Sequence, residues 1–126
     1  MSSTEPADEK PVVLNMKSIE SLQRLSAGNP TFVQSIFDAY LQQCERGIGD
    51  VEQLILEGDT TAIGDLAHKL KGGAAQLGAL AMADTCKKLE QVGFSGSTDG
   101  AKGLVEEIQV DFERLRIAVA ALNEGT

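Results

Sequence analysis

Tryptophan is absent from this chain of 126 residues, which contains one tyrosine and four phenylalanines. Large aromatic rings therefore contribute little to any core. The hydrophobic residues, 42% of the sequence, must fill it mainly as Leu, Ile, Val and Ala, a composition that favours helices. The length fits one domain that can bury a core without disulfide or metal support.

Cysteine is also scarce, and positive charge is in deficit. Cys44 and Cys86 are too few for a disulfide framework, and both occupy apolar positions of a helical pattern, which predicts reduced core residues in a cytoplasmic protein. Lys and Arg number 11 against 19 Asp and Glu, a formal net charge of −8 that would repel nucleic-acid phosphates. The chain shows no signal peptide and no apolar run near the ~18 residues of a membrane span. We therefore expect neither a nucleic acid nor a membrane as partner.

The spacing of apolar residues predicts an all-α fold. Residues 1–13 are polar and acidic with two prolines, which indicates a flexible N-terminal arm ahead of one domain at 14–126. No stretch of that domain alternates with period two for long enough to form a strand. Apolar steps of three and four instead predict helices over these ranges: 14–27, 29–58, 59–77, 79–93 and, after a loop at 93–100, a last helix through Leu104 to Leu122. Four long amphipathic helices with short connections imply an antiparallel up-down four-helix bundle with a short additional N-terminal helix.

His68 is the only histidine in the chain. On a helical wheel of residues 60–77 it lies opposite the apolar side, which predicts that its imidazole faces water. The apolar side consists of Ile63, Leu66, Leu70, Ala74 and Leu77. The residues that share the face of His68 are small or polar: Thr61, Gly64, Asp65, Lys71, Gly72 and Ala75.

Interior glycines at 64, 72 and 73 weaken the same helix, each by up to ~1 kcal/mol relative to alanine. A bare surface around His68 would let another protein approach the ring closely. Lys71, one turn on, and Lys69 supply cations for an anion such as a phosphoryl group on the ring. These residues alone leave two interpretations open, an incidental surface histidine and a site of chemistry.

The residues around His68 resemble the signature of histidine-containing phosphotransfer (Hpt) domains. The matching positions are Ala67-His68-Lys69-Leu70-Lys71-Gly72, Leu77-Gly78-Ala79, Leu80, Cys86 and Leu89-Glu90. The layout of the chain from about 13 to 123 is similar to that family too. The resemblance implies a histidine phosphocarrier in a multistep two-component phosphorelay, which takes a phosphoryl group from a receiver-domain aspartate and passes it to another receiver aspartate.

The resemblance also implies roles for single residues. His68 is the expected phosphoacceptor, Lys71 the lysine beside the phosphate, and Glu90 the acceptor for the inner ring nitrogen. Such an acceptor selects the tautomer in which Nε2 keeps a free lone pair. The expected receiver-docking residues are Gly64, Asp65, Lys69, Gly72 and Ala75. Of these, Gly72 is the glycine that leaves room for the receiver.

Two other functions compete with the phosphocarrier. One is a non-catalytic helical adaptor that binds receiver domains without phosphotransfer, although such a copy would be expected to lose His68. The other is a metal- or cofactor-binding bundle, which is disfavoured because one outward histidine and two inward cysteines on separate helices cannot form a ligand set.

The sequence contains no P-loop, no dinucleotide-binding glycine fingerprint and no carboxylate cluster suited to Mg²⁺. We therefore predict no kinase activity, no metal site and no cofactor of its own, with Mg²⁺ supplied by the partner receiver. The expected partners are response-regulator receiver domains and a hybrid sensor histidine kinase, and the expected state is a monomer. The initial Met and the polar arm favour a stand-alone protein over a module of such a kinase.

Overall fold

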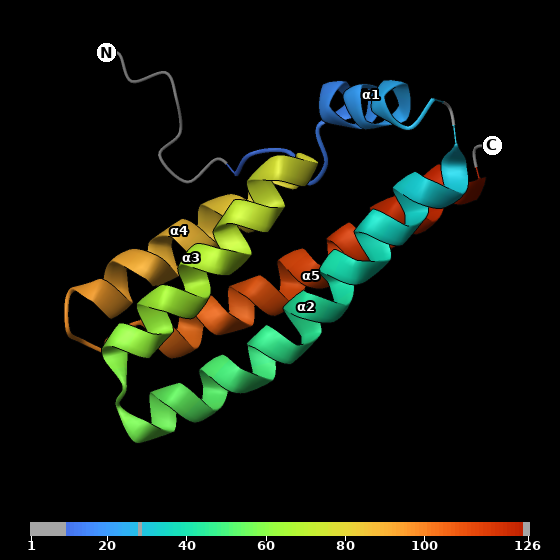
Figure 1. Ribbon diagram of the computed structural model, residues 1–126. Coiled ribbons are helices and arrows are strands. Elements are labelled where there is room, and N and C mark those ends of the chain that lie inside the picture. The colour runs from blue at the N-terminus through green and yellow to red at the C-terminus, as the bar shows by residue number, and fades with distance from the viewer. Residues whose placement is uncertain (1–9, 28, 125–126) are drawn as a thin grey trace, which may run out of the picture.

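The computed structural model describes residues 10–27 and 29–124, and these residues form five helices and no strand (Figure 1). In chain order the helices are α1 (Met16–Leu25), α2 (Pro30–Glu57), α3 (Thr60–Leu77), α4 (Leu80–Phe94) and α5 (Ala101–Glu124). Helices α2 to α5 lie side by side as an antiparallel bundle, and the short α1 lies at the end where α2 begins and α3 stops. The predicted all-α bundle with a short N-terminal helix is confirmed.

Capping residues set the ends of α2 and of α3, the helix that carries His68. The side chain of Asn29 accepts two backbone N–H bonds at the start of α2, and Asp59 accepts one at the start of α3. Gly58 and Gly78 end α2 and α3 in the left-handed conformation, with φ of 71° and 80°. That conformation favours glycine because a Cβ would be strained there.

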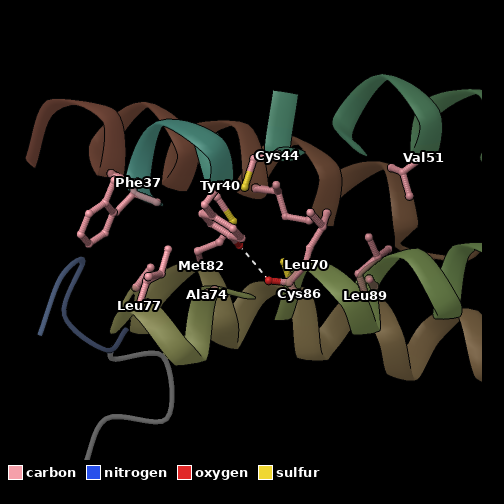
Figure 2. Packing of buried hydrophobic residues seen from close by; sticks show 14 of the residues in the cluster. Phe37, Tyr40, Cys44, Val51, Leu70, Ala74, Leu77, Met82, Cys86 and Leu89 are labelled. Atoms are coloured by element: carbon pink, nitrogen blue, oxygen red, sulfur yellow. Dashed lines mark hydrogen bonds between the residues drawn. The ribbon is translucent and has the colours of Figure 1, made fainter. Parts of the chain in front are cut away.

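One hydrophobic core joins the helices of the bundle, and Figure 2 shows part of it. Its largest fully buried side chains include Phe37, Ile63, Leu70, Met82, Leu89, Ile108 and Leu115. Cys44 and Cys86 are both buried free thiols, in agreement with the sequence. The hydroxyl of Tyr40 donates a hydrogen bond of 2.8 Å to the carbonyl oxygen of Leu70, which fixes α2 against α3.

Glycines allow the helices to approach closely at two places. A Cβ on Gly93 of α4 would lie 2.5 Å from the backbone nitrogen of Gly64 and 2.8 Å from the carbonyl oxygen of Thr60 on α3. A Cβ on Gly73 would lie 2.6 Å from the ring of Tyr40. Gly73 therefore serves packing against α2 and contributes nothing to a bare surface around His68.

Residues 10–15, here called the N-terminal strap, bind the turn between α3 and α4 and the side of α5. Asn15 N–H donates to the Gly78 carbonyl over 2.8 Å, and the N–H of Ala81 donates to the carbonyl of Val12 over 2.9 Å. The Lys10 ammonium lies 2.8 Å from a carboxylate oxygen of the buried Asp111. We expected residues 1–13 to be a flexible arm, but residues 10–13 instead make defined contacts with the bundle. Residues 1–9 of that arm lie outside the described part of the chain.

Among the helices of the described residues, none combines the length and the apolar character that a membrane span requires.

Candidate functional site

His68 lies midway along α3, on the side of the helix that faces away from the core. Its side chain is 64% exposed. Its neighbour Ala67 and the inward residues Leu70 and Ala74 are almost fully buried. The orientation predicted from the helical wheel is confirmed, and it leaves the imidazole accessible to another protein.

The carboxylate of Glu90, on α4, joins His68 and Lys71. One oxygen, Oε2, lies 2.7 Å from Nδ1 of His68. The other, Oε1, accepts a hydrogen bond of 2.6 Å from the ammonium of Lys71. The Glu90 side chain is only 14% exposed, whereas that of Lys71 is 30% exposed. The structure thus brings together the three residues that the sequence singled out for chemistry.

Charge fixes the roles of the two ring nitrogens. The hydrogen bond from Lys71, followed by that from His68, lowers the pKa of Glu90 below its ordinary value, and burial opposes this effect. The carboxylate is therefore ionised at neutral pH and can only accept hydrogen bonds, so Nδ1 of His68 must carry the hydrogen between them. In the neutral ring, Nε2 then has its lone pair free, and this nitrogen is available as a nucleophile.

Four of the five predicted docking residues lie on the open surface around the ring. They are Asp65, Lys69, Gly72 and Ala75, all of them exposed. A Cβ on Gly72 would meet no atom of the described residues within 4 Å, so the surface one turn beyond His68 is bare. This agrees with the expected close approach of a partner.

Gly64 does not belong to this open surface. It is buried, and a Cβ on it would lie 2.5 Å from two ring atoms of Phe94 at the end of α4. The prediction of a bare surface at Gly64 is wrong, because α4 and its last side chain cover it, and a part for this turn in docking stays a prediction. The periodicity of α3 cannot reveal this cover, which depends on how α4 packs.

Two surface features beside His68 were missed by sequence reasoning. One is Phe94, whose ring lies over Gly64 and which is 53% exposed as a residue. The other is a shallow depression between α3, α4 and the N-terminal strap, with these residues around it: Pro11, Lys71, Gly72, Ala75, Leu80, Ala83, Asp84 and Lys87. No local pattern marks the depression, because it forms where three separate segments meet.

Comparison with known proteins points to one family. The Hpt domain family model matches residues 35–125. Multistep phosphorelay regulator 1 of Schizosaccharomyces pombe is 35% identical over 81 residues, which is 64% of this chain and 28% of that protein. The virulence sensor protein BvgS of Bordetella parapertussis is 26% identical over 106 residues, 82% of this chain and 9% of that protein. The chain therefore spans a small part of either relative.

A solved structure gives the same answer for the fold. The crystal structure of histidine-containing phosphotransfer protein B from Pseudomonas aeruginosa superposes with a TM-score of 0.80 at 25% identity and covers 90% of this chain and 96% of that one. The match of the family model extends over most of the bundle and includes His68, Lys71 and Glu90. The chain belongs to the histidine-containing phosphotransfer (Hpt) domain family.

Proposed function

We propose that His68 is the phosphoacceptor of a phosphorelay carrier. Nε2 attacks the phosphorus of a receiver's phospho-aspartate, so that an N–P bond forms while the P–O bond to the aspartate breaks and its carboxylate leaves. The reverse step passes the phosphoryl group to the aspartate of a second receiver. The observation that carries this proposal is the 2.7 Å contact between Nδ1 and Glu90, which leaves Nε2 outward with a free lone pair.

Glu90 also suits the product of the reaction. Attack through Nε2 leaves a ring with hydrogen on Nδ1 and phosphorus on Nε2, and that ring carries positive charge. An ionised carboxylate already in place stabilises this charge without having to move. Lys71, three residues after His68, adds a cation close to the incoming phosphoryl oxygens.

The remaining parts of the reaction belong to the partner. Phosphoryl transfer depends on positioning and charge neutralisation, and we assign Mg²⁺ and the second half of the active site to the receiver. The names of the relatives, a multistep phosphorelay regulator and a virulence sensor protein, support receivers and a hybrid sensor kinase as partners. We place this exchange in the cytoplasm and assign it to a monomer.

Transfer from a purified phosphorylated receiver to the wild type and to His68→Gln tests the proposal. We expect an acid-labile, base-stable label on the wild type alone, because phosphohistidine has that stability and glutamine cannot accept the group. Equal labelling of both proteins would contradict the assignment of His68. Receiver binding by the wild type with no label on it would favour the non-catalytic adaptor.

A further inference from the structure

Phe94 is an exposed aromatic residue whose ring packs on a defined place on α3. Phe94 is the last residue of α4, and the residue is 53% exposed. The ring lies on Gly64, where a Cβ would approach two of its atoms to 2.5 Å. Gly93, its neighbour in the chain, brings the α4 backbone against α3 at the same place. Two glycines inside helices, each unfavourable for helix stability, thus hold the ring at the surface.

The ring of Phe94 and the turn of α3 beneath it adjoin the open surface around His68. Gly64 precedes His68 by four residues, which places it on the same face of α3 about 6 Å along the helix axis. Gly72 follows His68 by the same interval and leaves the face open on the other side. The phosphoacceptor therefore lies between a raised aromatic ring and bare helix.

Other large hydrophobic side chains are exposed as well, and scattered ones are normal on protein surfaces. Leu56 and Ile117 are examples, at 82% and 56% exposure. Phe94 differs from them because a partner that reaches His68 must also cover the neighbouring turn of α3, on which its ring rests. A partner with an Mg²⁺ site needs carboxylates around it, and this chain carries a net charge of −8, so long-range attraction contributes little. Burial of an apolar anchor then becomes the main source of affinity.

We propose that Phe94 is a docking and specificity residue that inserts into an apolar hollow beside the phospho-aspartate of the receiver. The inference rests on the phosphocarrier function proposed above. It assigns Phe94 no part in bond making, so loss of the ring should weaken the encounter and leave the reactivity of Nε2 intact. Receivers with a polar or charged surface at that point should be poor partners.

The test compares Phe94→Ala and Phe94→Leu with the control Ile117→Ala, which removes an equally exposed side chain from α5. Each protein is labelled by a phosphorylated receiver over a range of concentrations, and separately by phosphoramidate, a small donor that needs no docking. Phe94→Ala should raise KM for the receiver about ten-fold or more with little change in kcat, since loss of an aromatic anchor often has that effect. Phe94→Leu should recover part of the loss, and Ile117→Ala should match the wild type.

Several outcomes would overturn the inference. If Phe94→Ala leaves the KM for the receiver unchanged, Phe94 is not a docking residue. If Phe94→Ala loses as much labelling by phosphoramidate as by the receiver, the role of Phe94 is structural only. If sedimentation shows that the wild type self-associates and Phe94→Ala does not, the ring belongs to an interface between two copies. Failure of the wild type to be labelled by either donor would instead refute the phosphocarrier function itself, which separates the two failures.

Discussion

At the scale of single residues, Glu90 makes the site more than an exposed histidine. Its two oxygens hold different partners, Nδ1 of His68 and the ammonium of Lys71. The first bond selects the ring tautomer, and the second keeps the carboxylate ionised so that the first persists. A glutamine at this position could still accept from Nδ1, but it would bring no charge to Lys71 or to a phosphorylated ring.

Replacement of Glu90 by alanine should leave the His68 ring free to adopt either tautomer and should slow phosphotransfer. We expect ¹⁵N NMR of the His68 ring above neutral pH to show the Nδ1–H form in the wild type and a mixture in Glu90→Ala. The rate of phosphotransfer should fall about ten-fold or more, the loss typical when a residue that orients a metal-binding histidine is removed. Glu90→Gln should keep the tautomer and lose less rate. A single Nδ1–H form in Glu90→Ala would show that another group orients the ring.

The lowered pKa of Glu90 predicts how its contribution to stability depends on pH. A carboxyl group whose pKa is lower in the folded state stabilises the fold above its unfolded pKa, near 4.5, and this contribution disappears as the pH falls through the folded value. The difference in free energy of unfolding between wild type and Glu90→Gln should therefore be present at about pH 5 and shrink in more acidic solution. Urea titrations at a series of pH values measure it, and a difference that grows as the pH falls below about 5 would refute the ion pair.

At the scale of helices, the close packing of α3 and α4 depends on glycines that face the neighbouring helix and not on glycines that face solvent. Gly93 faces backbone atoms of α3 that cannot shift easily, whereas Gly72 faces no described atom within 4 Å. The two positions look alike in the sequence, because both are interior glycines of amphipathic helices. Only the packing distinguishes them.

Alanine at these two glycines should change stability in opposite directions. We expect Gly93→Ala to lower the free energy of unfolding by about 1–3 kcal/mol through overpacking. Gly72→Ala should raise it by up to about 1 kcal/mol through helix propensity. Urea denaturation followed by circular dichroism measures both. Gly103→Ala on α5, also open among the described residues, should behave like Gly72→Ala, and destabilisation by Gly72→Ala would contradict the bare surface assigned to it.

The N-terminal strap is fastened by a buried polar cluster. The ammonium of Lys10 contacts Asp111, Glu107 and the hydroxyl of Thr85, and Asp111 is 2% exposed. Burial opposes the charge on Lys10, but the hydrogen bonds that it donates to Asp111 and Glu107, together with the negative charges of these carboxylates, outweigh burial and raise the pKa of the ammonium. The strap thereby supplies the positive charge that the buried carboxylate requires.

Loss of that charge should destabilise the whole bundle. Lys10→Met leaves Asp111 buried without its cation, and we expect the free energy of unfolding to fall by about 1–3 kcal/mol, which chemical denaturation measures. Lys17→Met, a change at an exposed position of α1, is the matched control and should have little effect. Equal stability of Lys10→Met and wild type would show that the strap contributes nothing to folding.

At the scale of the whole molecule, the sequence predicted what depends on neighbours along the chain. Apolar periodicity and caps such as Asn29 and Gly78 located the helices, and the wheel placed His68 outward. The contacts that it missed join distant segments: Phe94 over Gly64, Gly73 against Tyr40, and Lys10 on Asp111. Such contacts depend on the register and depth of packing between helices, which hydrophobic spacing within one helix does not encode. The contact of Glu90 with His68 was anticipated only through family resemblance, because nothing in α4 alone points to His68.

The reactivity of the two buried cysteines towards a thiol reagent should measure the opening of the whole bundle. Burial raises the pKa of Cys44 to about 11 and that of Cys86 to about 12, so the reactive thiolate is rare in the folded protein. We expect a thiol reagent such as Ellman's reagent to label neither cysteine at pH 8 until the core opens, and to label both rapidly in urea. Rapid labelling of the folded protein would mean that the core opens locally near α2 and α4.

The contact between Lys10 and Asp111 spans 101 positions of the chain and so closes most of it into a noncovalent ring. A pulling force applied to the chain before Lys10 acts first on the contacts of Lys10 with α4 and α5. The force reaches α1 only after these contacts break. A domain fused before Lys10 would therefore be held at the side of the bundle that α4 and α5 form. The point from which it could extend towards His68 is then Lys10 on α4 and α5, and α1 is not part of the connection.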